Sequence, residues 1–130
     1  MKKNNGFTLS ELLIVVAIIA VLTAIAIPVF VGQLERSKEA TDMANGRSAY
    51  AAAVTAYLNG NTKDGKATAS FTYTQGVSGW GYETGEISYD IKMNDATVSE
   101  TVQLPDGTKD TEVTITVSED EDGNVTVKAE

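Results

Sequence analysis

One carboxylate stands at a position where an ionised group is costly. Glu11 directly precedes residues 12–31, LLIVVAIIAVLTAIAIPVFV, in which only Thr23 and Pro28 are not apolar. Within a membrane helix an ionised acid costs roughly 3 kcal/mol, so it usually has a partner. The chemistry that Glu11 offers is therefore charge pairing.

The residue types that carry most catalysis are missing from this chain. It has no cysteine and no histidine, which excludes a disulfide, a thiol nucleophile, an imidazole base and a Cys/His zinc site. Residues 120–124, read as an EF-hand loop, would place Ser118 first and Ala129 last, so both key ligands are absent. A net charge of −8 disfavours nucleic acid as a partner. We expect no enzyme activity, no cofactor and no metal site.

A long helix must position Glu11. A run of about 20 apolar residues has the length of a transmembrane helix. Helical spacing continues through Ala40–Leu58, and Asn59-Gly60-Asn61 provides a stop. A helix over 7–58 is roughly 78 Å long at 1.5 Å per residue. No single core buries such a rod, so its first half must lie in lipid or against other chains.

Two features of this helix give local expectations. Pro28 predicts a kink, because it lacks an amide proton and clashes with the preceding turn. The spacing predicts that one stripe of the second half faces the rest of the domain: Ala40, Met43, Ala44, Arg47, Ala51, Val54 and Leu58.

The remainder, residues 61–130, is polar and acidic. It holds 14 acids and 5 bases and alternates apolar with polar residues near 71–74, 87–91, 98–102, 113–117 and 125–127. This period is typical of half-buried strands, and Pro105-Asp-Gly107 and residues 120–124 carry turn residues. We expect an α+β fold: a long N-terminal helix whose second half packs on one small antiparallel sheet of four or five strands.

Three interpretations of the N-terminus compete. The first is a secretory signal peptide cut after Ala24-Ile-Ala26, and the second is a plain signal anchor. Against the first stand Glu11, an apolar run that continues to Val31, and Pro28 just after the cut. The second leaves Gly6-Phe7 and Glu11 unexplained. The third is a resemblance: Gly6-Phe-Thr-Leu-Ser-Glu-Leu-Leu-Ile14, after a short leader with Lys2 and Lys3, resembles the class III signal of type IV prepilins and pseudopilins.

The resemblance implies specific roles. A prepilin peptidase would cut between Gly6 and Phe7 and N-methylate Phe7, and Glu11 would pair with the α-amine of a neighbouring subunit. Pro28 would be the helix-bending proline, while Ala20 stands where many members carry glycine. The implied organisation is a cleaved leader (1–6), a transmembrane and polymerisation helix (7–31), an amphipathic helical segment (32–60) and an acidic sheet head (61–130).

The expected function is that of a structural subunit in a type IV pilus-like helical filament. Before assembly it would be a single-pass plasma membrane protein with a cytoplasmic N-terminus; afterwards it would be extracellular. Its partners would be copies of itself, the peptidase and methylase, and the pilus assembly platform. Alternatives are a type II secretion pseudopilin, a competence pilin or a minor pilin. Another class is a secreted or anchored binding module whose aromatic loop offers Trp80 and Tyr82 as surface contacts.

Overall fold

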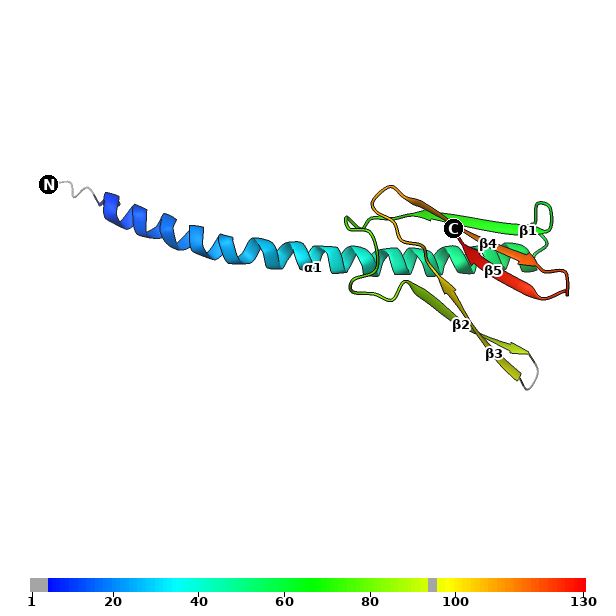
Figure 1. Ribbon diagram of the computed structural model, residues 1–130. Coiled ribbons are helices and arrows are strands. Elements are labelled where there is room, and N and C mark those ends of the chain that lie inside the picture. Colours follow the sequence, from blue (N-terminus) through cyan, green and yellow to red (C-terminus); the bar gives the residue numbers. More distant parts are fainter. Residues whose placement is uncertain (1–4, 94–95) are drawn as a thin grey trace. The chain divides into compact units, whose positions relative to one another are not determined.

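The computed structural model describes residues 5–93 and 96–130, and for residues 89–99 it describes no side chains. The chain divides into two compact units, residues 1–34 and residues 35–130. One helix, α1 (Leu9–Leu58), contributes its first part to unit 1 and its second part to unit 2 (Figure 1). The strands all belong to unit 2.

Unit 1 consists of the start of α1 and the residues before it. The helix begins at Leu9, two residues later than predicted, because Thr8 takes the capping position. It continues through Pro28. The Thr23 hydroxyl donates to the carbonyls of Ile19 and Ala20, so this polar group is satisfied within the helix itself.

The end of α1 confirms the predicted stop. Gly60 has a φ of 73°, and its N–H donates to the Tyr57 carbonyl at 3.1 Å. The Asn61 N–H donates to the Ala56 carbonyl at 2.9 Å. These two bonds form a Schellman motif, which satisfies carbonyls that the last helical turn leaves free.

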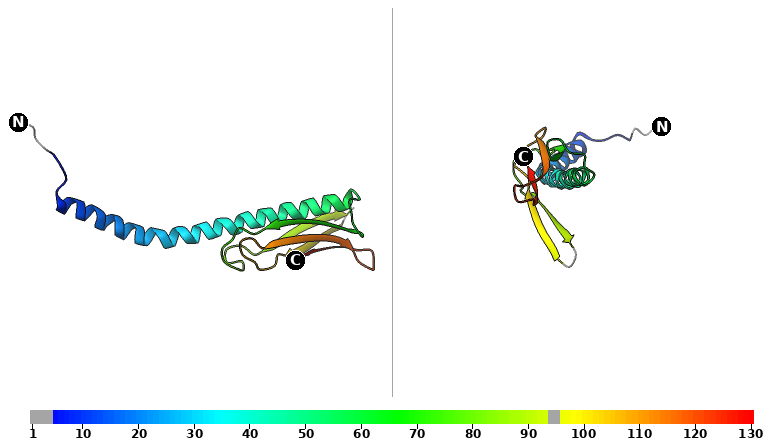
Figure 2. Two further views of the ribbon diagram at one scale, coloured as in Figure 1. Left: turned by 90° about the horizontal axis from the view of Figure 1, so that it is seen from above. Right: turned by 90° about the vertical axis from the view of Figure 1, so that its right-hand side faces the viewer.

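The described residues of unit 2 form five strands in two antiparallel sheets, which can be followed in Figure 2. The larger sheet has the order β1 (Lys66–Thr72), β4 (Glu112–Glu119) and β5 (Val125–Ala129). The smaller is the hairpin of β2 (Glu86–Met93) and β3 (Ala96–Gln103). Each predicted strand overlaps an observed one, but β1 lies mostly before the predicted residues 71–74. The 120–124 turn joins β4 to β5.

The predicted α+β fold is confirmed, but the strands form two sheets and not one. Residues Pro105-Asp-Gly107 do not close a hairpin between β3 and β4; the segment crosses to the loop after β1 instead. The Lys109 N–H donates to the Gln75 carbonyl, and the Asp110 N–H donates to the Tyr73 carbonyl. The backbone groups of this connection are used by a loop, so β3 and β4 do not pair.

The core of unit 2 lies between α1 and the sheets. From β4 it takes three side chains with no exposed surface: Val113, Ile115 and Val117. From α1 it takes Met43, Ala49 and Ala53, with Gly46 also buried. A Cβ added at Gly46 would lie 3.0 Å from Leu104 Cδ1, so this glycine allows close packing.

The predicted helical stripe was wrong for most of its members. Met43 is buried and Val54 half-buried, but the others are exposed: Ala40, Ala44, Arg47, Ala51 and Leu58. The buried face also includes Glu39 and Asp42. Alanines occur on every side of this segment and give little contrast between faces, whereas the buried carboxylates are satisfied by partners far away in the sequence.

Candidate processing and assembly site

The start of α1 is closed by a reciprocal pair of hydrogen bonds. The Thr8 N–H donates to Glu11 Oε2 at 3.0 Å, and the Glu11 N–H donates to Thr8 Oγ1 at 3.2 Å. This is a capping box, which satisfies two of the N–H groups that a helix start leaves unpaired. The negative charge also lies at the positive end of the helix dipole. Glu11 therefore has a partner within its own chain.

The Gly6–Phe7 peptide bond precedes this cap in non-helical backbone. Both residues are exposed, and the Phe7 side chain is 84 % exposed. A Cβ added at Gly6 would meet no atom within 4 Å. Packing within this chain therefore does not require glycine at position 6.

The side chains of unit 1 form an exposed apolar surface on every side of the helix. All the large apolar side chains of residues 12–31 are between 47 % and 67 % exposed. Burying one such side chain is worth about 1.5–3 kcal/mol, so covering this set is worth tens of kcal/mol in all. That exceeds the net stability of about 5–15 kcal/mol of an ordinary domain. The surface requires lipid or other protein to cover it.

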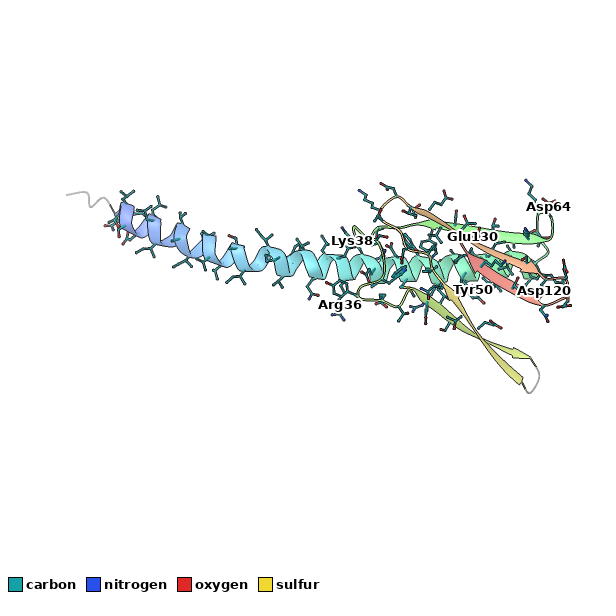
Figure 3. The ribbon with its side chains drawn as sticks, in the orientation of Figure 1. Arg36, Lys38, Tyr50, Asp64, Asp120 and Glu130 are labelled. Carbon is teal, nitrogen blue, oxygen red and sulfur yellow. The ribbon has the colours of Figure 1, made fainter. Side chains whose placement is uncertain are left out.

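Unit 2 contains three carboxylates on one face of α1, Glu35, Glu39 and Asp42, which we call the carboxylate row. Figure 3 labels Arg36 and Lys38, two bases of the same part of α1, which point to opposite sides of the helix. Glu35 accepts hydrogen bonds from the N–H groups of Gly76 and Val77 at 2.7 and 2.9 Å. Positions 35, 39 and 42 are separated by four and three residues, which aligns them along the helix.

The other two members of the row are buried. Glu39 accepts from the N–H groups of Gly81, Tyr82 and Glu83 at 2.7–3.2 Å. Asp42 accepts from the N–H groups of Thr74 and Gln75 and from the Thr74 hydroxyl at 2.8–3.0 Å. Seven backbone N–H groups between residues 74 and 83 are thus held by three side chains of one helix.

The aromatic residues of this loop pack mainly inward. The Tyr73 and Trp80 rings meet edge to face with centroids 5.6 Å apart, and Trp80 is half-buried. Burial, with the nearby charges of Asp42 and Asp106, raises the pKa of Tyr73 to about 12. Its hydroxyl donates to the Pro105 carbonyl. Of the two aromatics predicted as surface contacts, Tyr82 is the more exposed, at 54 %.

The structure brings some predicted residues together and leaves others apart. Gly6, Phe7 and Glu11 lie at one helix start, whereas Trp80 and Tyr82 belong to unit 2. Thr8 was not predicted, although threonine three residues before glutamate and ahead of an apolar run is the signature of a capping box. The carboxylate row has no such local signature, because its partners lie 32 to 44 residues away.

Comparisons with known proteins find similarity in the N-terminal part of the chain. Residues 1–27 match the family model of the prokaryotic N-terminal methylation motif. The chain is also 52 % identical over 50 residues to the type IV major pilin protein PilA of Myxococcus xanthus (strain DK1622). That match covers 38 % of this chain and only 23 % of the relative's length. No solved structure matches the chain.

Fold and motif together define an α+β protein with a long apolar N-terminal helix that begins in a methylation motif. The helix is long and apolar enough to cross a membrane, by length and composition. The N-terminal part of this chain is similar to type IV pilins, through the methylation motif at residues 1–27 and the 50 residues that it shares with PilA.

Proposed function

We propose that this chain is a structural, non-catalytic subunit of a type IV pilus-like filament that polymerises through its N-terminal helix. The observation that carries the proposal is the apolar surface of unit 1, which is exposed on all sides and lies mostly within the residues that match the methylation motif. Lipid covers this surface in the membrane-held subunit before assembly, and the helices of other copies cover it in the filament. The acidic residues of 61–130 keep the heads soluble outside.

Processing occurs at the helix start. Prepilin peptidase cuts the exposed Gly6–Phe7 bond on the cytoplasmic side and N-methylates Phe7. Because Gly6 meets nothing in its own chain, the demand for a small residue comes from the enzyme. Cleavage leaves the Thr8–Glu11 cap intact and creates an ammonium at Phe7, one helical turn from Glu11.

Assembly then exchanges a partner of Glu11. The carboxylate that accepts from its own Thr8 N–H meets the Phe7 ammonium of a neighbouring copy, and this charge pair fixes the axial register. A pair in low dielectric gains more from its attraction than one in water. Subunits reach this state from the plasma membrane with the help of the assembly platform.

Two variants separate the cap from the charge. Glu11→Gln keeps an oxygen that accepts from the Thr8 N–H but removes the charge, whereas Glu11→Ala removes both. We expect both variants to be processed and both to be lost from sheared filaments. Wild-type filament levels for Glu11→Gln would show that the charge pair has no role in assembly.

Intact mass tests the processing step directly. The proposal predicts a mature chain that starts at Phe7 and carries one added methyl group. A chain that starts at Ile27 would indicate ordinary secretion, and one that retains Met1 would indicate a plain anchor; either result contradicts the proposal.

A further inference from the structure

In the part of α1 that follows the apolar run, the basic side chains are more exposed than the acidic ones. Residues 32–58 contain three acids and three bases, so the segment is neutral by composition. The three acids form the carboxylate row, and all of them bind the 74–83 loop. Arg36 and Arg47 remain exposed, with no ion pair among the described residues. Folding thus turns the acids of this segment toward the loop and leaves its bases exposed around the helix.

The first bases after the apolar run lie at one end of unit 2. Arg36 is exposed, and the Lys38 side chain is 37 % exposed, with its ammonium only 4.0 Å from the already bonded Glu35. Val77 lies beside the same turn of α1, because its N–H donates to Glu35. Its side chain is 64 % exposed. The 104–111 connection adds Lys109 and two exposed acids, Asp106 and Asp110.

Distance along the helix identifies what these bases can reach. From Val31, the last residue of the apolar run, Arg36 lies about 7.5 Å further along, and Arg47 about 24 Å further. The headgroup layer is about 5–7 Å thick on each side of the hydrocarbon core. Long basic side chains extend toward such a layer while their stems pack on apolar groups. Arg36 and Lys38 reach phosphate groups, and Arg47 does not.

We propose that Arg36 and Lys38 bind the phosphates of phospholipid headgroups in the membrane-held subunit, with the Val77 side chain entering the same interfacial layer. This rests on the transmembrane placement of the proposed function, but not on filament assembly. The contact holds the head close to the bilayer surface before polymerisation, and extraction of the helix breaks it.

The absence of cysteine makes a direct test simple. Val77→Cys introduces a unique thiol on an exposed side chain. The full chain, labelled there with a fluorophore, is reconstituted in vesicles of phosphatidylglycerol and phosphatidylcholine that contain a headgroup-nitroxide lipid. We expect stronger quenching than in pure phosphatidylcholine vesicles, and we expect it to weaken as salt is added.

Variants then identify the residues responsible. Each cation near an anionic surface is worth about 1 kcal/mol, a roughly five-fold change in the ratio of docked to undocked heads. Arg36→Gln combined with Lys38→Gln therefore lowers that ratio roughly 25-fold, and the quenching falls toward the phosphatidylcholine value. The matched control Arg47→Gln removes the same kind of charge from the same helix and leaves the quenching unchanged.

Three results would overturn the proposal. One is equal quenching for the double variant and the parent, and another is equal loss in Arg47→Gln. The third is quenching that appears only as the protein-to-lipid ratio rises, which would identify a second copy as the partner. Resistance to carbonate extraction checks insertion separately. An inserted chain without headgroup quenching defeats only this inference, whereas a chain that is not inserted defeats the proposed function as well.

Discussion

Replacing Asp42 by alanine removes the most deeply buried member of the carboxylate row. Asp42 has no exposed surface and binds three donors: the N–H groups of Thr74 and Gln75 and the Thr74 hydroxyl. A hydrogen bond to a charged group contributes about 1.5–3 kcal/mol. Water can replace the carboxylate at the exposed Thr74, but not at the fully buried Gln75. We expect Asp42→Ala to lower the free energy of unfolding by about 3 kcal/mol.

The assay uses the single tryptophan of the chain. Trp80 lies in the loop that the row holds, so its fluorescence follows the unfolding of unit 2 by urea in the full chain, kept in detergent micelles. With a slope of about 1.5 kcal/mol per molar urea, the loss lowers the midpoint by roughly 2 M. Asp42→Asn keeps one acceptor oxygen, so its urea midpoint should lie about halfway between those of the parent and of Asp42→Ala.

The matched control is Thr41→Ala at the neighbouring position. Thr41 is exposed, and its hydroxyl donates only to the Ser37 carbonyl of its own helix. Its removal should change stability by less than about 0.5 kcal/mol. If Asp42→Ala had the same midpoint as Thr41→Ala, the loop would not depend on the carboxylate row and this reasoning would fail.

Three further outcomes follow from the packing and turns of unit 2. Gly107→Ala would place a Cβ 2.6 Å from the fixed Tyr73 ring, so urea unfolding should show a loss of about 1–3 kcal/mol. Gly123→Ala forces a φ of 84° on alanine in the β4–β5 turn, and the same measurement should show a loss of about 1 kcal/mol. The pKa of Tyr73 is raised to about 12 in the folded chain, so the protonated hydroxyl adds to the free energy of unfolding. This contribution is complete below pH 10 and is lost as the pH rises from 10 to about 12. Tyr73→Phe should remove that dependence in urea titrations at a series of pH values; a drop of the same size in the variant would contradict it.

The features predicted well from the sequence are those that depend on neighbouring residues. The helix stop at Asn59-Gly60-Asn61 needs only a left-handed residue after a helical run, and Gly60 provides it. The alternation in β4 predicts which of its residues are buried, and Val113, Ile115 and Val117 are. The motif at Gly6–Glu11 is equally local, because its residues adjoin one another in the sequence.

The features that could not be predicted depend on partners far away in the sequence. Glu39 and Asp42 look like ordinary surface acids of a helix, and only the 74–83 loop makes their burial favourable. The division into two sheets depends on the bonds of Lys109 and Asp110 to the loop after β1. The spacing of apolar residues does not report such contacts, so the predicted buried face of residues 40–58 was wrong for most of its members.

The way in which the carboxylate row holds its loop affects how this protein can evolve. Glu35, Glu39 and Asp42 bind main-chain N–H groups, which every amino acid except proline provides. The outward side chains of the loop, such as Val77 and Tyr82, are not needed for its shape. Substitutions can therefore change the exposed surface of this loop while the three helix residues stay constant and preserve its backbone conformation.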